Sequence, residues 1–238
     1  MKNNPAKRLL IILEEGKRIP TNMNCKEVWC KLLEVEDRNN LSLILSRLGK
    51  LMELPDIIIK DIIKHYPEQK SYKHWSTRVN NSFSKQNLNS SWLTFIEGID
   101  EHAIEYLRMS SALLDNNSDE ELLTSEQLLN IKKNIDGIIN DILDSDISEN
   151  LKKYIIKYLR KILIAIEEYK ISGIEPIIES LETTLGHAFL DDEYKSVILK
   201  ESSIGEKIRN TLADIANLVT TCQGVFSIAQ LTNLIPLK

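Results

Sequence analysis

Glycine, proline and cysteine are scarce in this chain. It contains 8 glycines, 6 prolines and 3 cysteines among 238 residues, and only 6% of its residues are aromatic. Few helix-breaking residues in a chain of this length favour long helices over a succession of tight turns. Three unpatterned cysteines do not form a disulfide framework and are typical of reduced thiols, so we expect a cytoplasmic protein.

An excess of positive charge is also missing. The chain has 30 lysines and arginines against 35 aspartates and glutamates, a formal net charge of −5. Proteins that bind nucleic acid over much of their surface are basic, so this composition disfavours that class but allows a local basic patch. Hydrophobic residues make up 42% of the chain, which is enough for a packed core and too many for disorder.

The familiar motifs of catalytic sites are absent from the sequence. There is no Walker A loop, no glycine fingerprint for a dinucleotide and no G-x-S-x-G elbow. All-helical nucleases of the HEPN type carry an arginine four to six residues before a histidine, and none of the four histidines here has one. We therefore expect no catalytic residues, and the sequence leans away from an enzyme.

Metal and cofactor sites are not indicated either. His187 and Asp191 have the i, i+4 spacing that lets two ligands meet on one helical face, but no second histidine supports them. We interpret that segment as a polar loop after Gly186, and Cys25 and Cys30 as core residues. The sequence predicts no bound metal and no cofactor.

The apolar residues recur at helical spacing, which predicts an all-α fold of about ten to eleven helices. The strongest pattern lies at about 125–170, where two heptad-like repeats predict an antiparallel hairpin with coiled-coil packing. The first repeat consists of Ile131, Ile135, Ile138 and Ile142, and the second of Leu151, Ile155, Tyr158, Ile162, Ala165 and Tyr169. Thr124 and Gln127 have the spacing of a capping box that begins the hairpin.

The most polar and acidic stretch, at 115–124, is the best candidate for a domain boundary. We therefore expect an N-terminal unit of short helices at 1–116 and a C-terminal helical bundle at 117–238. In the first unit, Gly16 is expected to end a helix and Pro55 to begin one. A single long helix is expected from about residue 90 to 114.

Residues 69–96 are a basic, aromatic stretch without any acidic residue. The candidate patch for a nucleic acid or a protein partner consists of Lys70, Lys73, Trp75, Arg78 and Lys85. Lysine and arginine neutralise phosphates, and aromatic rings stack on unpaired bases. The alternative is structural, because Trp75, Val79 and Phe83 also share one helical face.

The C-terminal residues 215–237 carry no charged side chain. Four amide side chains in this tail disfavour a membrane span, so the tail is interpreted as core of the C-terminal bundle, as a docking surface, or as a site of reversible membrane association. The candidate docking residues in it are Val219, Val225, Phe226, Leu231 and Leu234.

Three segments, "PAKRLLIILEEGKRIP", "CKEVWCKLL" and "LSRLGKLMELPDIII", resemble a family of uncharacterised small all-helical proteins from diverse bacteria. The resemblance lies mainly in residues 5–60 and brings no activity or site residue with it. Families of this kind often belong to defence or toxin–antitoxin loci. We expect a non-enzymatic interaction component that docks on another protein, or on itself, through its C-terminal bundle. The alternatives are nucleic-acid binding through 69–96 and, third, a membrane-associating effector.

Overall fold

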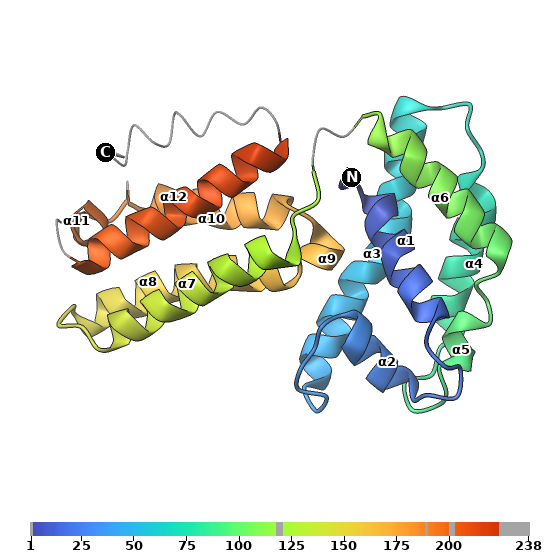
Figure 1. Cartoon of the computed structure of the whole chain (residues 1–238), viewed down its shortest axis with the longest axis horizontal. Helices are drawn as coiled ribbons and strands as arrows, with labels where there is room; N and C mark the ends of the chain where they lie inside the picture. Colours follow the sequence, from blue (N-terminus) through green and yellow to red (C-terminus); the bar gives the residue numbers. More distant parts are fainter. Residues whose placement is uncertain (1, 118–120, 189, 200–202, 224–238) are drawn as a thin grey trace. The chain divides into compact units, whose positions relative to one another are not determined.

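The computed structural model describes residues 2–117, 121–188, 190–199 and 203–223 (Figure 1). Within these ranges the chain forms twelve α-helices and no β-strand, and an isolated bridge joins Asn24 to Ser91. The predicted all-α fold is confirmed, and the number of helices is close to the expected ten to eleven.

The chain folds into two compact units. Unit 1 consists of Met1–Asp119 together with Lys170–Gly173, and unit 2 consists of Glu120–Tyr169 together with Ile174–Lys238. From the sequence we expected a single domain boundary, between residues 116 and 117, and that boundary stays a prediction. The sequence did not lead us to expect that Lys170–Gly173 would belong to unit 1.

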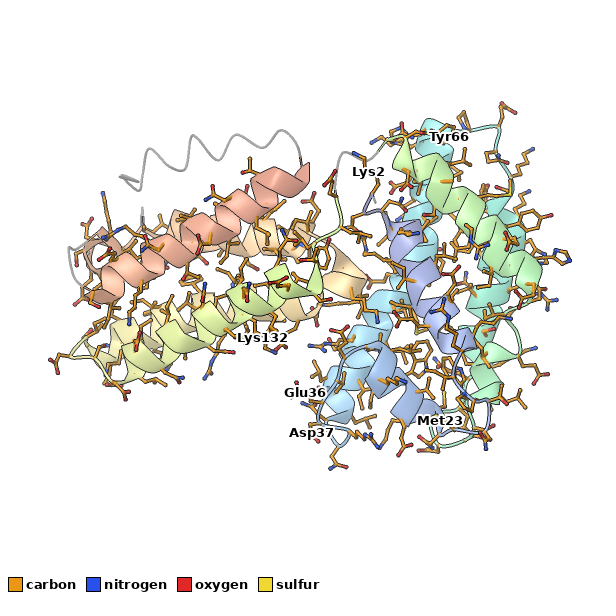
Figure 2. The ribbon with its side chains drawn as sticks, in the orientation of Figure 1. Lys2, Met23, Glu36, Asp37, Tyr66 and Lys132 are labelled. Carbon is orange, nitrogen blue, oxygen red and sulfur yellow. The ribbon has the colours of Figure 1, made fainter. Side chains whose placement is uncertain are left out.

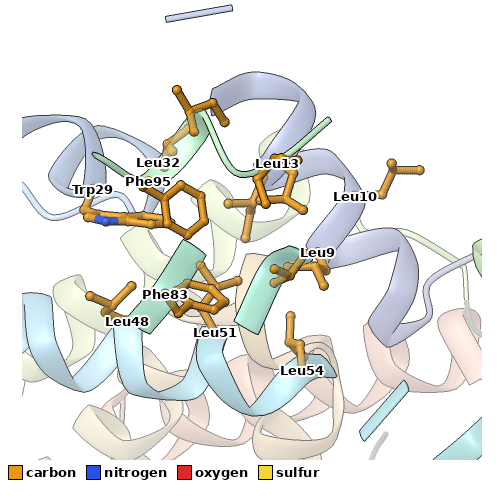
Figure 3. Close-up of a cluster of buried hydrophobic side chains, with 14 of the residues drawn as sticks. Leu9, Leu10, Leu13, Trp29, Leu32, Leu48, Leu51, Leu54, Phe83 and Phe95 are labelled. Carbon is orange, nitrogen blue, oxygen red and sulfur yellow. The ribbon is translucent and has the colours of Figure 1, made fainter. Parts of the chain in front are cut away.

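Unit 1 is built from six helices around an aromatic core. They are α1 (Pro5–Lys17), α2 (Cys25–Leu32), α3 (Leu41–His65), α4 (Tyr72–Lys85), α5 (Leu93–Ile96) and α6 (Glu101–Asp115). Helix α1 packs against α3 and α6, and α4 packs against the same two helices. At the centre of this core, the ring centre of Trp29 lies 4.9 Å from the ring centre of Trp92 and 4.8 Å from that of Phe95, and both pairs are arranged edge to face. Figure 3 shows Trp29 and Phe95 among leucines of α1, α2 and α3.

The sequence predicted that Gly16 ends helix α1, but the helix continues to Lys17. The indole Nε1 of Trp92 donates a hydrogen bond to the carbonyl oxygen of Gly16 at 2.9 Å. A Cβ atom added at Gly16 would lie 3.0 Å from the Trp92 ring. The glycine therefore permits the close approach of the indole, which is a packing requirement that local sequence does not reveal.

Two other predicted helix boundaries are wrong. Pro55 lies inside α3, because residues on both sides of it share one buried face and that burial outweighs the roughly 3 kcal/mol cost of an internal proline. The long helix expected at about 90–114 is interrupted between α5 and α6. There the carboxylate of Asp100 accepts a hydrogen bond from the Ala103 N–H at 2.7 Å and so caps a new helix.

Unit 2 is a helical bundle. It contains α7 (Ser125–Leu143), α8 (Glu149–Glu167), α10 (Glu175–His187), α11 (Asp192–Leu199) and α12 (Ser203–Gln223). Helix α8 packs against α7 and α10, and α12 closes the bundle against α7, α10 and α11 (Figure 1). Both predicted apolar repeats are buried in this core, which confirms the hairpin. The capping box is also confirmed, since Thr124 and Gln127 exchange side chain to backbone hydrogen bonds.

Helix α9 (Tyr169–Ser172) begins in unit 2 and continues in unit 1. The Arg8 guanidinium donates to the carbonyl oxygen of Ile171 at 2.9 Å, and Lys170 pairs with Glu15 at 2.7 Å. The Ile171 side chain is buried in the core of unit 1. Gly173, with a φ of +76°, then turns the chain toward α10, a backbone conformation that favours glycine.

Candidate docking surfaces

Helix α4 carries most of the basic patch predicted from the sequence. Lys70, Lys73, Arg78 and Lys85 are exposed, on or just ahead of this helix. Trp75 is not part of that surface, because its side chain is fully buried and its Nε1 donates to the Ser110 hydroxyl at 3.1 Å. The prediction of a stacking residue at Trp75 is therefore wrong, and the apolar stripe of Trp75, Val79 and Phe83 belongs to the core.

Asp100 neutralises part of this patch. Its carboxylate lies 2.9 Å from the Arg78 guanidinium and 3.2 Å from the His74 Nε2. Burial alone raises the pKa of Asp100, but the hydrogen bonds from Ala103 N–H and His74 and the charge of Arg78 outweigh it and hold that pKa below its ordinary value. Arg78 of α4 is thus paired with the N-cap residue of α6, and the exposed lysines remain as the basic part of the surface.

The predicted docking tail divides into a described and an undescribed part. Val219 lies on α12, fully buried in the core of unit 2 beside Ile215 and Leu212, so it cannot serve as a docking residue on the surface. Val225, Phe226, Leu231 and Leu234 lie outside the described residues. Among the described helices, none is both long and apolar enough to cross a bilayer.

A second basic surface, which the sequence analysis missed, lies on α8. We call it the α8 basic face, and it consists of Lys153, Lys157, Arg160 and Lys161. All four are exposed, and their spacing of four, three and one residues places them on one side of the helix. The opposite side is buried in the bundle through residues that include Leu151, Ile155 and Ile162.

The cations of the α8 basic face are not neutralised by the unit that carries them. Within the described residues, no carboxylate forms an ion pair with any of the four. Lys157 and Lys161 instead place their Nζ atoms 5.9 and 5.6 Å from the centre of the Tyr158 ring. By contrast, Lys132 of α7, labelled in Figure 2, pairs with Glu167 at 2.7 Å.

The signal for this face is present in the sequence as "KKYIIKYLRK" at 152–161. No acidic residue occurs between Glu149 and Glu167, and five cations, Lys152 and the four of the α8 basic face, lie within residues 152–161, almost three turns of helix. The same segment carries the apolar repeat of the hairpin. Only the buried position of that repeat shows that the remaining side of α8 is both basic and available.

His187, at the end of α10, lies in a cluster of tyrosines. Its ring centre is 4.9 Å from those of Tyr158 and Tyr194 and 5.8 Å from that of Tyr154, and its Nε2 is 3.6 Å from the Asp191 carboxylate. Burial raises the pKa of Tyr194 well above its ordinary value. Among the described residues, no group of three or more potential ligands gathers to hold a metal ion. The aromatic rings thus make this cluster a packing contact between α8, α10 and α11.

Cys25 and Cys30 are buried thiols of α2. Burial raises the pKa of both, which keeps them protonated and weakly nucleophilic near neutral pH. Their burial confirms the interpretation of these two cysteines as core residues.

No family model, curated protein or solved structure matches this chain. The comparisons therefore bring no residue, ligand or activity to these surfaces. Their roles have to be inferred from the charge, burial and geometry of the chain itself.

Proposed function

We propose that this protein is a non-enzymatic interaction module that binds an acidic protein surface through the C-terminal bundle, unit 2. The observation that carries this proposal is the α8 basic face, where four exposed cations on a helix anchored in the core lack acidic partners among the described residues. The helix backbone is already ordered and presents its charges at fixed spacing, so an acidic partner can pair with several of them with little further loss of backbone freedom.

The charge of unit 2 favours a protein over a nucleic acid as the partner. Its two segments contain 12 lysines and arginines and 19 aspartates and glutamates. A long polyanion that approached the α8 basic face would be repelled by this acidic excess, whereas a protein with a local acidic stripe would meet the basic face alone. Charge complementarity of this kind mainly raises association rates and selects the partner.

A photo-crosslinking amino acid at Lys157 tests the proposal in the cells to which the chain is native. We expect a protein adduct that is lost when Arg160 and Lys161 are both replaced by glutamate. The same crosslinker at Lys133, an exposed lysine of α7, is the matched control and should give no such adduct. An adduct with nucleic acid, or the absence of any adduct from Lys157, would refute the proposal.

Nucleic-acid binding through residues 69–96 remains the second candidate, supported by exposed Lys70, Lys73 and Lys85. The pairing of Arg78 with Asp100 and the burial of Trp75 reduce what this surface offers to a phosphate backbone or an unpaired base. Fluorescence anisotropy with labelled single-stranded RNA at several salt concentrations tests it, since affinity through phosphates falls steeply as salt rises. The expected place in a bacterial defence locus stays a prediction from the family resemblance.

A further inference from the structure

Helix α3 of unit 1 exposes more apolar side chains than any other helix that the structure describes. Of the fourteen large apolar residues that are exposed in the described part of the chain, five lie on α3, and no other described helix carries more than two. Single exposed apolar residues are normal on a soluble protein, whereas a continuous patch commonly marks a binding surface. The arrangement of the five on α3 therefore decides what this surface can do.

Four of these five residues lie in one stripe along the helix. We call it the α3 apolar stripe, and with the half-buried Ile59 it consists of Leu41, Leu45, Met52, Ile59 and Ile63. At about 100° per residue, the five positions fall within about 40° around the helix axis, and they span about 33 Å of helix. The four exposed side chains are 43–49% exposed, so the fold of one chain leaves the stripe open.

The spacing of the α3 apolar stripe is the same when it is counted from either end. Successive members are four, seven, seven and four residues apart, so Met52 lies at the midpoint. In an antiparallel pair of α3 helices with a two-fold axis at Met52, Leu41 of one copy faces Ile63 of the other. Leu45 faces Ile59 in the same way, so every member of the stripe meets an apolar side chain. A two-fold contact requires this self-complementary pattern and an unrelated partner does not, so the spacing selects a second copy of the chain.

The border of the stripe leaves room for a facing helix. Gly49, half-buried at this border, has no side chain, and a Cβ atom placed there meets no other atom within 4 Å. In the antiparallel pair, Gly49 of one copy lies opposite Pro55 and Asp56 of the other. The Asp56 carboxylate is exposed at the edge of the contact, so it can stay in water and is not buried against an apolar group.

The size of the stripe indicates a weak and reversible contact. A contact about 33 Å long and one helix diameter wide, about 10 Å, has a footprint on the order of 300 Å² per copy. A stable interface of standard size takes about 800 Å² from each partner. The stripe thus supports association at high protein concentration, and a two-fold contact of this kind closes at two copies.

We infer that two copies of this chain associate through the α3 apolar stripe, as an antiparallel two-fold pair with Met52 on the axis. The inference goes beyond the proposed function, because it concerns a surface of unit 1 and not the α8 basic face. Since the contact is apolar, added salt should weaken it little, whereas a contact made of exposed ion pairs is screened by salt.

Cysteines placed in the stripe test its geometry. All variants are full-length chains with Cys222→Ser, which leaves only the two buried thiols of α2. Met52→Cys should form a disulfide-linked dimer on mild oxidation, because residue 52 of one copy faces residue 52 of the other. Leu41→Cys is the matched control: it should not link to itself, but it should link to Ile63→Cys when the two chains are mixed.

Sedimentation equilibrium of the full-length chain measures the association itself. The average mass of the natural chain should rise with protein concentration toward two copies and not beyond. Met52→Lys should weaken this association by about tenfold or more, because two like charges then meet at the axis of an apolar contact. Ile57→Lys is the control, since Ile57 is exposed on another side of α3 and should leave the dimer intact. Far-UV circular dichroism shows that each variant is folded.

A natural chain that stays monomeric up to about 1 mM would overturn the inference, as would a dimer that Met52→Lys and Ile57→Lys weaken equally. Linkage of Leu41→Cys to itself in preference to Ile63→Cys would show a parallel contact and would overturn the antiparallel pair. A dimer that is lost on reversal of the charges of the α8 basic face would place the contact on unit 2 and overturn the inference as well.

Discussion

At the scale of single residues, Arg47 is a buried cation that completes the end of a helix. Its guanidinium Nη1 donates to the carbonyl oxygens of Leu33 and Glu34 at 2.9 and 2.8 Å, just after α2 ends. Glu34 adopts a φ of 55°, which is uncommon for a residue with a side chain. Arg47 thus holds a strained turn and satisfies carbonyl groups that the helix leaves without partners.

Replacing Arg47 by methionine should lower the free energy of unfolding by about 3 kcal/mol, since two hydrogen bonds from a charged donor are lost in a buried site. Urea denaturation followed by tryptophan fluorescence measures this change, because all three tryptophans belong to unit 1. Arg38→Met is the control, since Arg38 is exposed and its ion pair with Glu27 spans 3.4 Å. If both variants lost the same stability, Arg47 would have no special role.

Asp100 makes stability depend on pH in a defined direction. Its pKa is lower in the folded chain than in the unfolded chain, so its charge stabilises the fold above an ordinary pKa of 3.8. That contribution is lost as the pH falls through the lower, folded-state pKa.

Asp100→Asn should retain the cap but remove the charge, with a loss of about 0.5–1 kcal/mol at neutral pH. The difference in unfolding free energy from the natural chain should shrink as the pH falls below 3.8. Urea denaturation across a pH series measures it, with Asp56→Asn, an exposed change on α3, as control. A difference that is constant across this range would contradict the assignment of the stabilisation to the Asp100 charge.

At the scale of elements, α8 shows two sides with different roles. Ile162 is fully buried against the rest of the bundle, while Ile164, two residues later, is 52% exposed beside the α8 basic face. The same residue type therefore holds the hairpin together at one position and borders the proposed docking surface at the other.

Ile162→Ala should destabilise unit 2 by about 2–4 kcal/mol, because it removes buried methyl and methylene groups and leaves a cavity. Ile164→Ala should change stability by less than about 0.5 kcal/mol, since it removes exposed surface. Denaturation followed by far-UV ellipticity compares the two variants on the same helix. Equal losses would show that the exposed position is packed in solution.

At the scale of the whole molecule, the chain passes twice through unit 1. Ile171 is 2% exposed in the core of unit 1, and Ile174, after Gly173, is 1% exposed in the core of unit 2. Two isoleucines only three residues apart thus stabilise different units. This arrangement ties the folding of unit 1 to a segment that lies far along the chain.

Ile171→Asp should strongly lower the urea concentration at the midpoint of the tryptophan fluorescence transition, because it buries a carboxylate in the core of unit 1. Ile174→Asp should shift the midpoint of far-UV ellipticity and leave the tryptophan transition closer to that of the natural chain. Equal shifts of both signals in both variants would show that the two units unfold together instead.

The candidate surfaces illustrate why sequence reasoning reached part of the site. Lys70, Lys73 and Lys85 were predicted as exposed cations and are exposed. Trp75 was assigned to the same surface, because spacing alone does not show which side of α4 meets Ser110 and the core. The α8 basic face was not predicted, because the same segment carries a strong apolar repeat and was interpreted only as the second helix of the hairpin.

What the sequence by itself determined is local. Periodic apolar residues and the capping box of Thr124 and Gln127 specify helices and a hairpin. A helix must bury its apolar side, and its first N–H groups need hydrogen-bond acceptors. Only the tertiary structure decided which charges are paired: Asp100 forms an ion pair with Arg78, while the cations of the α8 basic face are exposed. Ion pairing across the fold depends on residues distant in sequence, and no local pattern encodes those distances.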